Sequence, residues 1–183
     1  VSGGQSVVEV TRSGTEYAAK TVSVANCNFT GLAIARNTLY ANCGDGSLWA
    51  GSLADSNLRL SEIYRYKAMG LANGLSNGLE SNTLYAVDGP VSGSSLPSSK
   101  IVRLKLASTN PNKVESDEVW LNLNGSFPNG LQRQGRILYY TDSSLPNLGR
   151  LNAVLIRPDG TAGEPRVVST LQSLPDDFSL LPD

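Results

Sequence analysis

Three segments of this sequence repeat one pattern, in which a Gly-Leu step is followed within a few residues by a Leu-Tyr pair that lies in a strand-like run. The pairs begin at Leu39, Leu84 and Leu138, so 45 residues lie from the first to the second and 54 from the second to the third. A four-stranded β-propeller blade takes roughly 40–50 residues. Each pair is followed by two more strand-like runs, at residues 47–53 and 58–64, 100–106 and 118–123, and 150–156 and 166–171.

This repeat predicts an all-β chain, residues 1–183 forming a single β-propeller domain of four-stranded blades, three complete and a fourth in part. A β-sandwich also has evenly spaced strands, but its strands do not normally repeat one sequence pattern at the length of a blade. Eighteen glycines, nine prolines and only 17% charged residues are typical of short strands joined by turns.

The two ends of the chain predict incomplete blades. Residues 5–26 read as the two outer strands of a preceding blade, and residues 175–181 as the innermost strand of a following one. Each blade of a propeller is buried only against its neighbours. We therefore expect the remaining blades to come from another segment or another chain.

The charge balance and the lack of histidine restrict the chemistry. Fifteen basic and sixteen acidic residues give a net charge of -1, so neither nucleic acid nor an anionic membrane is an expected partner. Because the chain has no histidine, Ser-His-Asp catalysis and histidine-ligated metals are excluded. Carboxylates, amides, hydroxyls or a metal held by oxygen atoms remain.

Two cysteines and two glycosylation sequons favour a secreted protein. Cys27 precedes a predicted innermost strand, and Cys43 ends the neighbouring strand that returns to the same end of the blade, so we expect them to form a disulfide. The sequons place candidate N-glycans on Asn28 and Asn124.

Polar residues recur where the chain leads into each innermost strand, and this end of a propeller faces its central axis. An Asn-Gly or Asp-Asp step occurs at Asn73, Asn77, Asn129 and Asp176. Amide and carboxylate oxygens that converge on an axis suit a hard divalent cation such as Ca²⁺. Asn-Gly and Pro-Asp pairs also form ordinary turns, so a structural role for these residues is the alternative.

The third segment resembles a known family. Residues 128–143 read PNGLQRQGRILYYTDS, and residues 174–177 read LPDD. These stretches are similar to consecutive blades of the regucalcin and gluconolactonase family of six-bladed propellers. The resemblance implies a portion of a six-bladed ring.

The same resemblance implies roles for four residues. It makes Asn129 and Asp176 ligands of calcium, and Asn77, or Asn73 in its place, a contact of a small-molecule substrate. The family's glutamate ligand has no counterpart here, and Asp177 replaces the glycine that follows the family's aspartate.

The function implied by the resemblance is calcium-dependent hydrolysis of lactones or related esters, with Asp176 as the catalytic residue. A strictosidine synthase-like enzyme on the same scaffold is one alternative, and a propeller that binds a partner without catalysis is the other. Asp88 and Asp142 end strands near the same mouth, where we expect them to cap turns, and support of the metal ligands by hydrogen bonds is the alternative.

Overall fold

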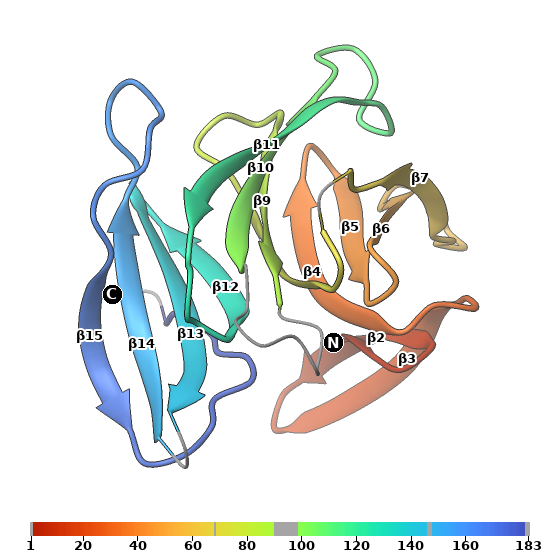
Figure 1. Ribbon diagram of the computed structural model, residues 1–183. Helices are drawn as coiled ribbons and strands as arrows, with labels where there is room; N and C mark the ends of the chain where they lie inside the picture. Colours follow the sequence, from red (N-terminus) through yellow and green to blue (C-terminus); the bar gives the residue numbers. More distant parts are fainter. Residues whose placement is uncertain (1, 68, 90–98, 146–147, 182–183) are drawn as a thin grey trace.

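The computed structural model describes residues 2–67, 69–89, 99–145 and 148–181, and these form fifteen strands in four separate sheets (Figure 1). No helix long and apolar enough to cross a membrane occurs in these ranges. The first sheet has three strands in the order β1-β2-β3, and they are β1 (Ser2–Gly3), β2 (Ser6–Ser13) and β3 (Glu16–Val24).

The other three sheets are complete four-stranded antiparallel blades, here called blades 1, 2 and 3, as the repeat predicts. Blade 1 contains β4 (Phe29–Ala35), β5 (Thr38–Cys43), β6 (Ser47–Ser52) and β7 (Ser61–Arg65). Blade 2 contains β8 (Ala72–Asn77), β9 (Thr83–Asp88), β10 (Lys100–Leu106) and β11 (Val114–Asn122). Blade 3 contains β12 (Pro128–Gln134), β13 (Ile137–Leu145), β14 (Leu148–Leu155) and β15 (Arg166–Leu171).

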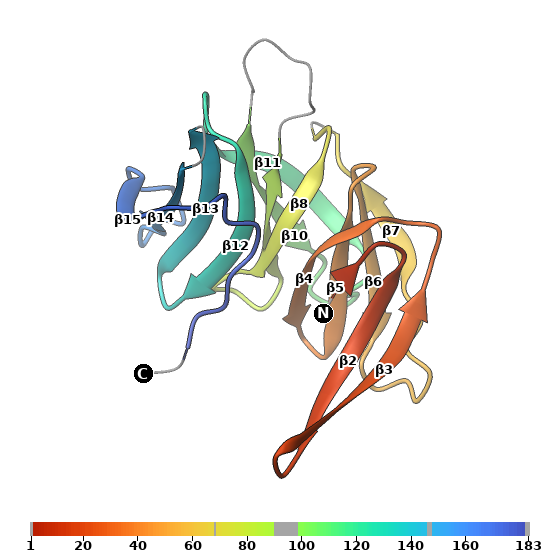
Figure 2. The same cartoon turned by 90° about the horizontal axis from the view of Figure 1, so that it is seen from below.

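The innermost strands β4, β8 and β12 lie side by side in chain order (Figure 2). Their close approach explains the repeated glycine. A Cβ on Gly74 would lie 2.7 Å from the Leu131 backbone nitrogen, and a Cβ on Gly31 would lie 2.7 Å from that of Leu75. The Gly-Leu step is therefore required by the contact between neighbouring blades.

Substituting Gly74→Ala is expected to destabilise the protein by about 1–3 kcal/mol, because the new methyl group would push two inner strands apart. Urea unfolding of the variant and of the parent protein measures this loss. Gly44→Ala is the matched control, since a Cβ there meets its nearest atom at 3.5 Å, an ordinary van der Waals contact. Equal losses in the two variants would contradict the packing account.

The core lies between the sheets, with one apolar cluster in each interface. Leu48, Leu75 and Leu104 are fully buried between blades 1 and 2, and Leu131 and Leu138 between blades 2 and 3. The tryptophans also fill inter-blade space: the Trp49 ring contacts that of Phe29 edge to face, and the Trp120 ring lies 4.8 Å from that of Tyr85.

The incomplete blades differ in how far they match the prediction. Strands β2 and β3 form the outer hairpin expected for residues 5–26. Residues 175–181 are not a strand, but they follow β12: the Gly130 backbone nitrogen donates to the Asp176 carbonyl oxygen at 2.8 Å. This segment occupies the place of an innermost strand without the neighbour that would complete a ladder among the described residues.

A candidate metal site at the mouth of the propeller

The candidate site lies where the innermost strands begin, here called the mouth. Asn73 is the second residue of β8 and Asn129 the second of β12, and each precedes the glycine of the inter-blade contact. Both pairs lie inside strands with no positive φ, so neither is a turn. The inter-blade contact accounts for the glycines of these Asn-Gly pairs and leaves the two asparagines available for another role.

Asn129 and Asp176, the expected ligand pair, are in direct contact. The Asn129 Nδ2 donates to the Asp176 Oδ1. The Asp176 carbonyl oxygen also accepts a hydrogen bond from the Thr141 Oγ1 at 3.0 Å, and the Pro175 carbonyl accepts one from the Ser143 Oγ at 3.2 Å. Blade 3 therefore fixes the backbone that carries the carboxylate, while Asp176 itself is exposed.

Asn73 is held at the equivalent position by buried hydrogen bonds. Its carbonyl oxygen accepts from the Asn42 Nδ2 at 2.7 Å, and the Asn42 Oδ1 accepts from the Tyr66 hydroxyl at 2.7 Å. Burial raises the pKa of Tyr66 well above its ordinary value, and the negative charge of the nearby Asp117 carboxylate raises it further. The hydroxyl therefore keeps its proton and remains a hydrogen-bond donor.

The structure does not bring Asn77 to the mouth. Asn77 ends β8 at the opposite end of the strand, where its side chain donates to the Ile34 carbonyl and accepts from the Arg133 guanidinium, both at 3.3 Å. Asn73 and Asn77 are each followed by Gly-Leu, so the motif could not separate them. Gly78 lies in the turn after β8, whereas Gly74 makes the inter-blade contact, and this register identifies Asn73 as the counterpart of Asn129.

Carboxylates at the ends of the second strands stabilise the loops around the mouth. The Asp88 Oδ1 accepts from the Gly70 and Leu71 backbone nitrogens at 3.0 and 3.2 Å, and the Asp142 Oδ1 accepts from the Phe127 nitrogen at 2.9 Å. Asp88 also forms a buried ion pair with Lys100 at 3.1 Å. The capping role predicted for both aspartates is confirmed.

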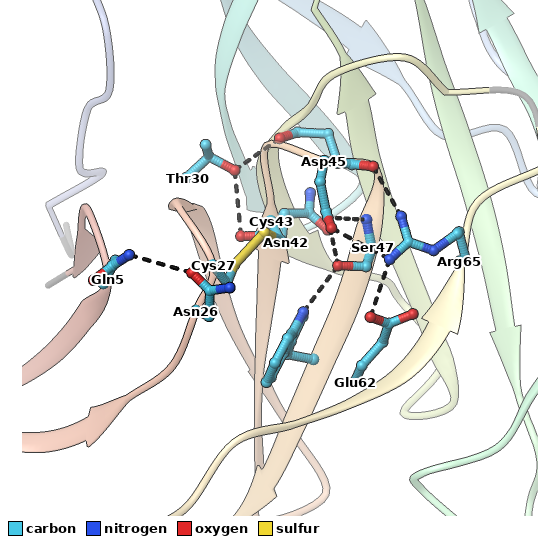
Figure 3. The surroundings of a disulfide bond; sticks show 12 residues. Gln5, Asn26, Cys27, Thr30, Asn42, Cys43, Asp45, Ser47, Glu62 and Arg65 are labelled. Carbon is cyan, nitrogen blue, oxygen red and sulfur yellow. Dashed lines mark hydrogen bonds and ion pairs between the residues drawn. A yellow bond between two sulfur atoms is a disulfide. The ribbon is translucent and has the colours of Figure 1, made fainter.

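A disulfide takes the place of this carboxylate in blade 1. Cys43 occupies the register position of Asp88 and Asp142, and its bond to Cys27 links the same strand end to the same loop (Figure 3). The two Cα atoms lie 5.7 Å apart, within the usual range for a disulfide. The predicted disulfide is confirmed, and the equivalence of the three caps was not visible in the sequence.

The side chains at the mouth carry the type of ligand atom that a hard cation prefers, which is oxygen. Asn73, Asn129 and Asp176 offer only oxygen as a ligand atom for calcium, which takes six to eight such ligands. No cluster of three or more histidine, cysteine, aspartate or glutamate residues that could hold a metal occurs in the described part of the chain. Amides, backbone carbonyls and water would therefore have to supply most of the ligands of a cation held here.

Both sequon asparagines are exposed. Asn124 lies in the turn before β12, where Gly125 has a positive φ of 83°, and Asn28 lies in the loop that the disulfide secures. Neither side chain is buried, so both positions can accommodate a glycan. Glycosylation of Asn28 and Asn124 stays a prediction.

The sheet topology defines the class of protein: successive four-stranded sheets with adjacent inner strands are blades of a β-propeller. No protein-family model and no curated protein matches the sequence. The chain is similar to solved structures, and the sequence identities of 9–16% in the three described below mean that the similarity shows the fold alone.

Three of these structures are informative. A chain of a nidogen/laminin complex superposes with a TM-score of 0.73 at 16% identity, covering 96% of this chain and 63% of that one. The S511A mutant of puromycin hydrolase, complexed with PGG, gives 0.58 at 14% identity, covering 93% and 32%. A candidate 6-phosphogluconolactonase from Bacteroides uniformis gives 0.54 at 9% identity, covering 94% and 56%. The present chain thus spans less than two thirds of each.

Proposed function

We propose that the mouth binds calcium through Asn129 and Asp176 and that the protein hydrolyses lactones or related esters. The observation that carries this proposal is the contact of an amide and a carboxylate from adjacent inner-strand positions. The similarity to a candidate phosphogluconolactonase agrees with this activity at the level of the fold. Asn73, at the equivalent position one blade earlier, is the proposed contact of the substrate.

Each residue at the mouth has a separate role in the proposed hydrolysis. Bound calcium would polarise the substrate carbonyl and lower the pKa of a water molecule. Asp176 accepts a proton as the water oxygen adds to the carbonyl carbon, and returns it to the ring oxygen as the ester bond breaks. Asn73 orients the substrate through its amide, and Thr141 and Ser143 hold the backbone that carries Asp176.

A second function, binding of an extracellular protein without catalysis, is favoured by a different observation. The chain superposes well on a propeller from a nidogen/laminin complex. The disulfide agrees with an oxidising compartment, and we propose that the protein is secreted and carries N-glycans. Binding through the rim of the propeller would not require calcium.

Lactone hydrolysis measured with added calcium and with a chelator separates the two functions. We expect turnover that rises with calcium, is abolished by the chelator, and falls at least about a hundredfold in Asp176→Asn, because a general base typically contributes a factor of a hundred or more. Asp177→Asn is the matched control, since it removes the same charge from the adjacent residue. Turnover that persists in the chelator would overturn the calcium requirement, and absence of turnover with added calcium would overturn the hydrolase proposal.

A further inference from the structure

Among the residues that the structure describes, β1 covers only the first part of the edge of β2 in the first sheet. Strand β1 pairs with Ser6 and Val7, whereas Glu9, Val10 and Thr11 are registered with β3 on the other side. Figure 2 shows the β2–β3 hairpin projecting beyond the blade 1 sheet. A strand edge of this kind is a template for a further strand.

A groove of about 610 Å³ lies between this edge and blade 1, at the end of the blade opposite the mouth. Two of its apolar side chains are unusually open, since Val10 is 49% exposed and Ile34 is 54% exposed. Its apolar lining comes from β2, β3, the first two strands of blade 1, β8 and the loop after β6, and includes Val10, Val22, Ile34, Leu39, Leu53 and Leu58.

The complete blades show which strand occupies the position beside the open edge of β2. The Ala25 backbone nitrogen donates to the Gln5 carbonyl at 3.0 Å, and equivalent bonds join Tyr66 to Gly46 and Leu123 to Ser99. These bonds align β2 with β6 and β10, the third strands of blades 1 and 2. In those blades the third strand pairs with a second strand, β5 or β9, whose residues are all buried: β6 pairs over its whole length, and β10 pairs from Lys100 to Lys105.

The same alignment predicts the residue pattern of a strand that would extend β1 along β2. Gly3 pairs with Ser6 as Cys43 pairs with Ser47, so β1 corresponds to the last residues of a second strand. The preceding part of that strand carries the Leu-Tyr pair, and Leu39 pairs with Gly51, the counterpart of Val10. An occupant of the groove would therefore place leucine beside Val10 and tyrosine beside Glu9.

We propose that the groove accepts, by β-strand addition, an extended segment with the Leu-Tyr pattern of β5 and β9, antiparallel to β2 and continuous with β1. Backbone hydrogen bonds would supply affinity and the apolar groove would select the side chains. The strands β5, β9 and β13 of a second copy of this chain cannot be the occupant, because each is already paired on both sides within its own sheet.

Fluorescence polarisation tests the proposal with a labelled peptide of residues 34–40, which ends at the tyrosine and leaves the place of β1 free. The control is a peptide in which serine replaces its leucine and tyrosine. We expect saturable binding of the first peptide and at least about tenfold weaker binding of the control, since burial of the two side chains is worth more than 1.4 kcal/mol. Hydrogen exchange at residues 9–11 should slow about tenfold when the peptide is bound.

Two charge substitutions locate the binding. Ile34→Glu in the groove should weaken binding at least about tenfold, whereas Val167→Glu on β15, where the side chain is 56% exposed, should not. Leu53→Lys gives a second groove variant if Ile34→Glu does not fold. Absence of binding, equal binding of the two peptides, equal effects of the two glutamates, or unchanged exchange would each overturn the proposal. Self-association of the chain that Ile34→Glu abolishes would also overturn it, because the occupant would then be a second copy.

Discussion

Substituting Asp88→Asn is expected to destabilise the protein by about 3–5 kcal/mol, because it removes one partner of a buried ion pair and leaves the other charge uncompensated. The Asp88 and Lys100 side chains are only 9% and 15% exposed, and their charged atoms lie 3.1 Å apart. Asparagine retains an oxygen for the Gly70 and Leu71 backbone nitrogens, so the substitution isolates the loss of charge. Chemical denaturation measures the change in unfolding free energy.

The matched control for this prediction is Glu118→Gln, which breaks the ion pair of Glu118 with Arg103. These side chains are 55% and 34% exposed, and exposed pairs contribute about 0–1 kcal/mol. The substitution Lys100→Met with Asp88→Asn should recover part of the lost stability, because no unpaired charge then remains. A loss below about 1 kcal/mol for Asp88→Asn alone would show that the pair does not stabilise blade 2.

Removing the disulfide is expected to cost about 3 kcal/mol, the chain-entropy value for a closed loop of this length. Cys27 and Cys43 are 16 residues apart, and the bond secures the loop before β4. Comparing the unfolding of the oxidised protein with that of Cys27→Ala/Cys43→Ala measures the loss. Two free thiols in the unreduced protein would contradict the assignment.

The equivalence of the three caps predicts that an aspartate at position 43 can partly replace the disulfide. The variant Cys27→Ala/Cys43→Asp places a carboxylate where blades 2 and 3 have Asp88 and Asp142. It should be more stable than the double alanine variant by about 0.5–2 kcal/mol, the usual value of a carboxylate that caps backbone nitrogens. Equal stability would mean that position 43 does not act as a cap.

The blades could be predicted because their repeated residues meet a physical requirement. Gly74 permits close approach of neighbouring inner strands, and Leu84 and Leu138 are fully buried in the second strands. A residue with such a constraint recurs once in each blade. The number of complete blades and the order of their strands follow from that recurrence.

The alignment of the innermost strand of blade 2 with that of blade 3 could not be predicted from the sequence. The choice of Asn77 over Asn73 as the substrate contact depended on that alignment. Blade spacing is a poor guide here because the connections differ in length, whereas the contact between Gly74 and Leu131 fixes the alignment directly. The equivalence of the Cys27–Cys43 bond with two carboxylate caps was hidden for another reason. Cysteine and aspartate share no sequence signal, although they serve the same position.

Residues 175–181 show a further limit of the sequence. Their pattern predicts an innermost strand, but a strand needs a hydrogen-bonded neighbour, and none is present on the open side within the described part of the chain. The position of Asp176 survives because the contacts with Gly130 and Thr141 on the other side are sufficient. The arrangement of the proposed ligand pair therefore depends on contacts with blade 3.

Calcium titration by isothermal calorimetry, with the protein and its Asp176→Ala variant, tests the central claim most directly. We expect saturable binding to the protein, loss of that binding in Asp176→Ala, and its retention in the control Asp177→Ala. At a calcium concentration a hundred times the dissociation constant, binding should stabilise the fold by about 2.7 kcal/mol, and Asp176→Ala should remove this gain. Identical heats and an identical thermal response in the protein and in Asp176→Ala would contradict the proposed site.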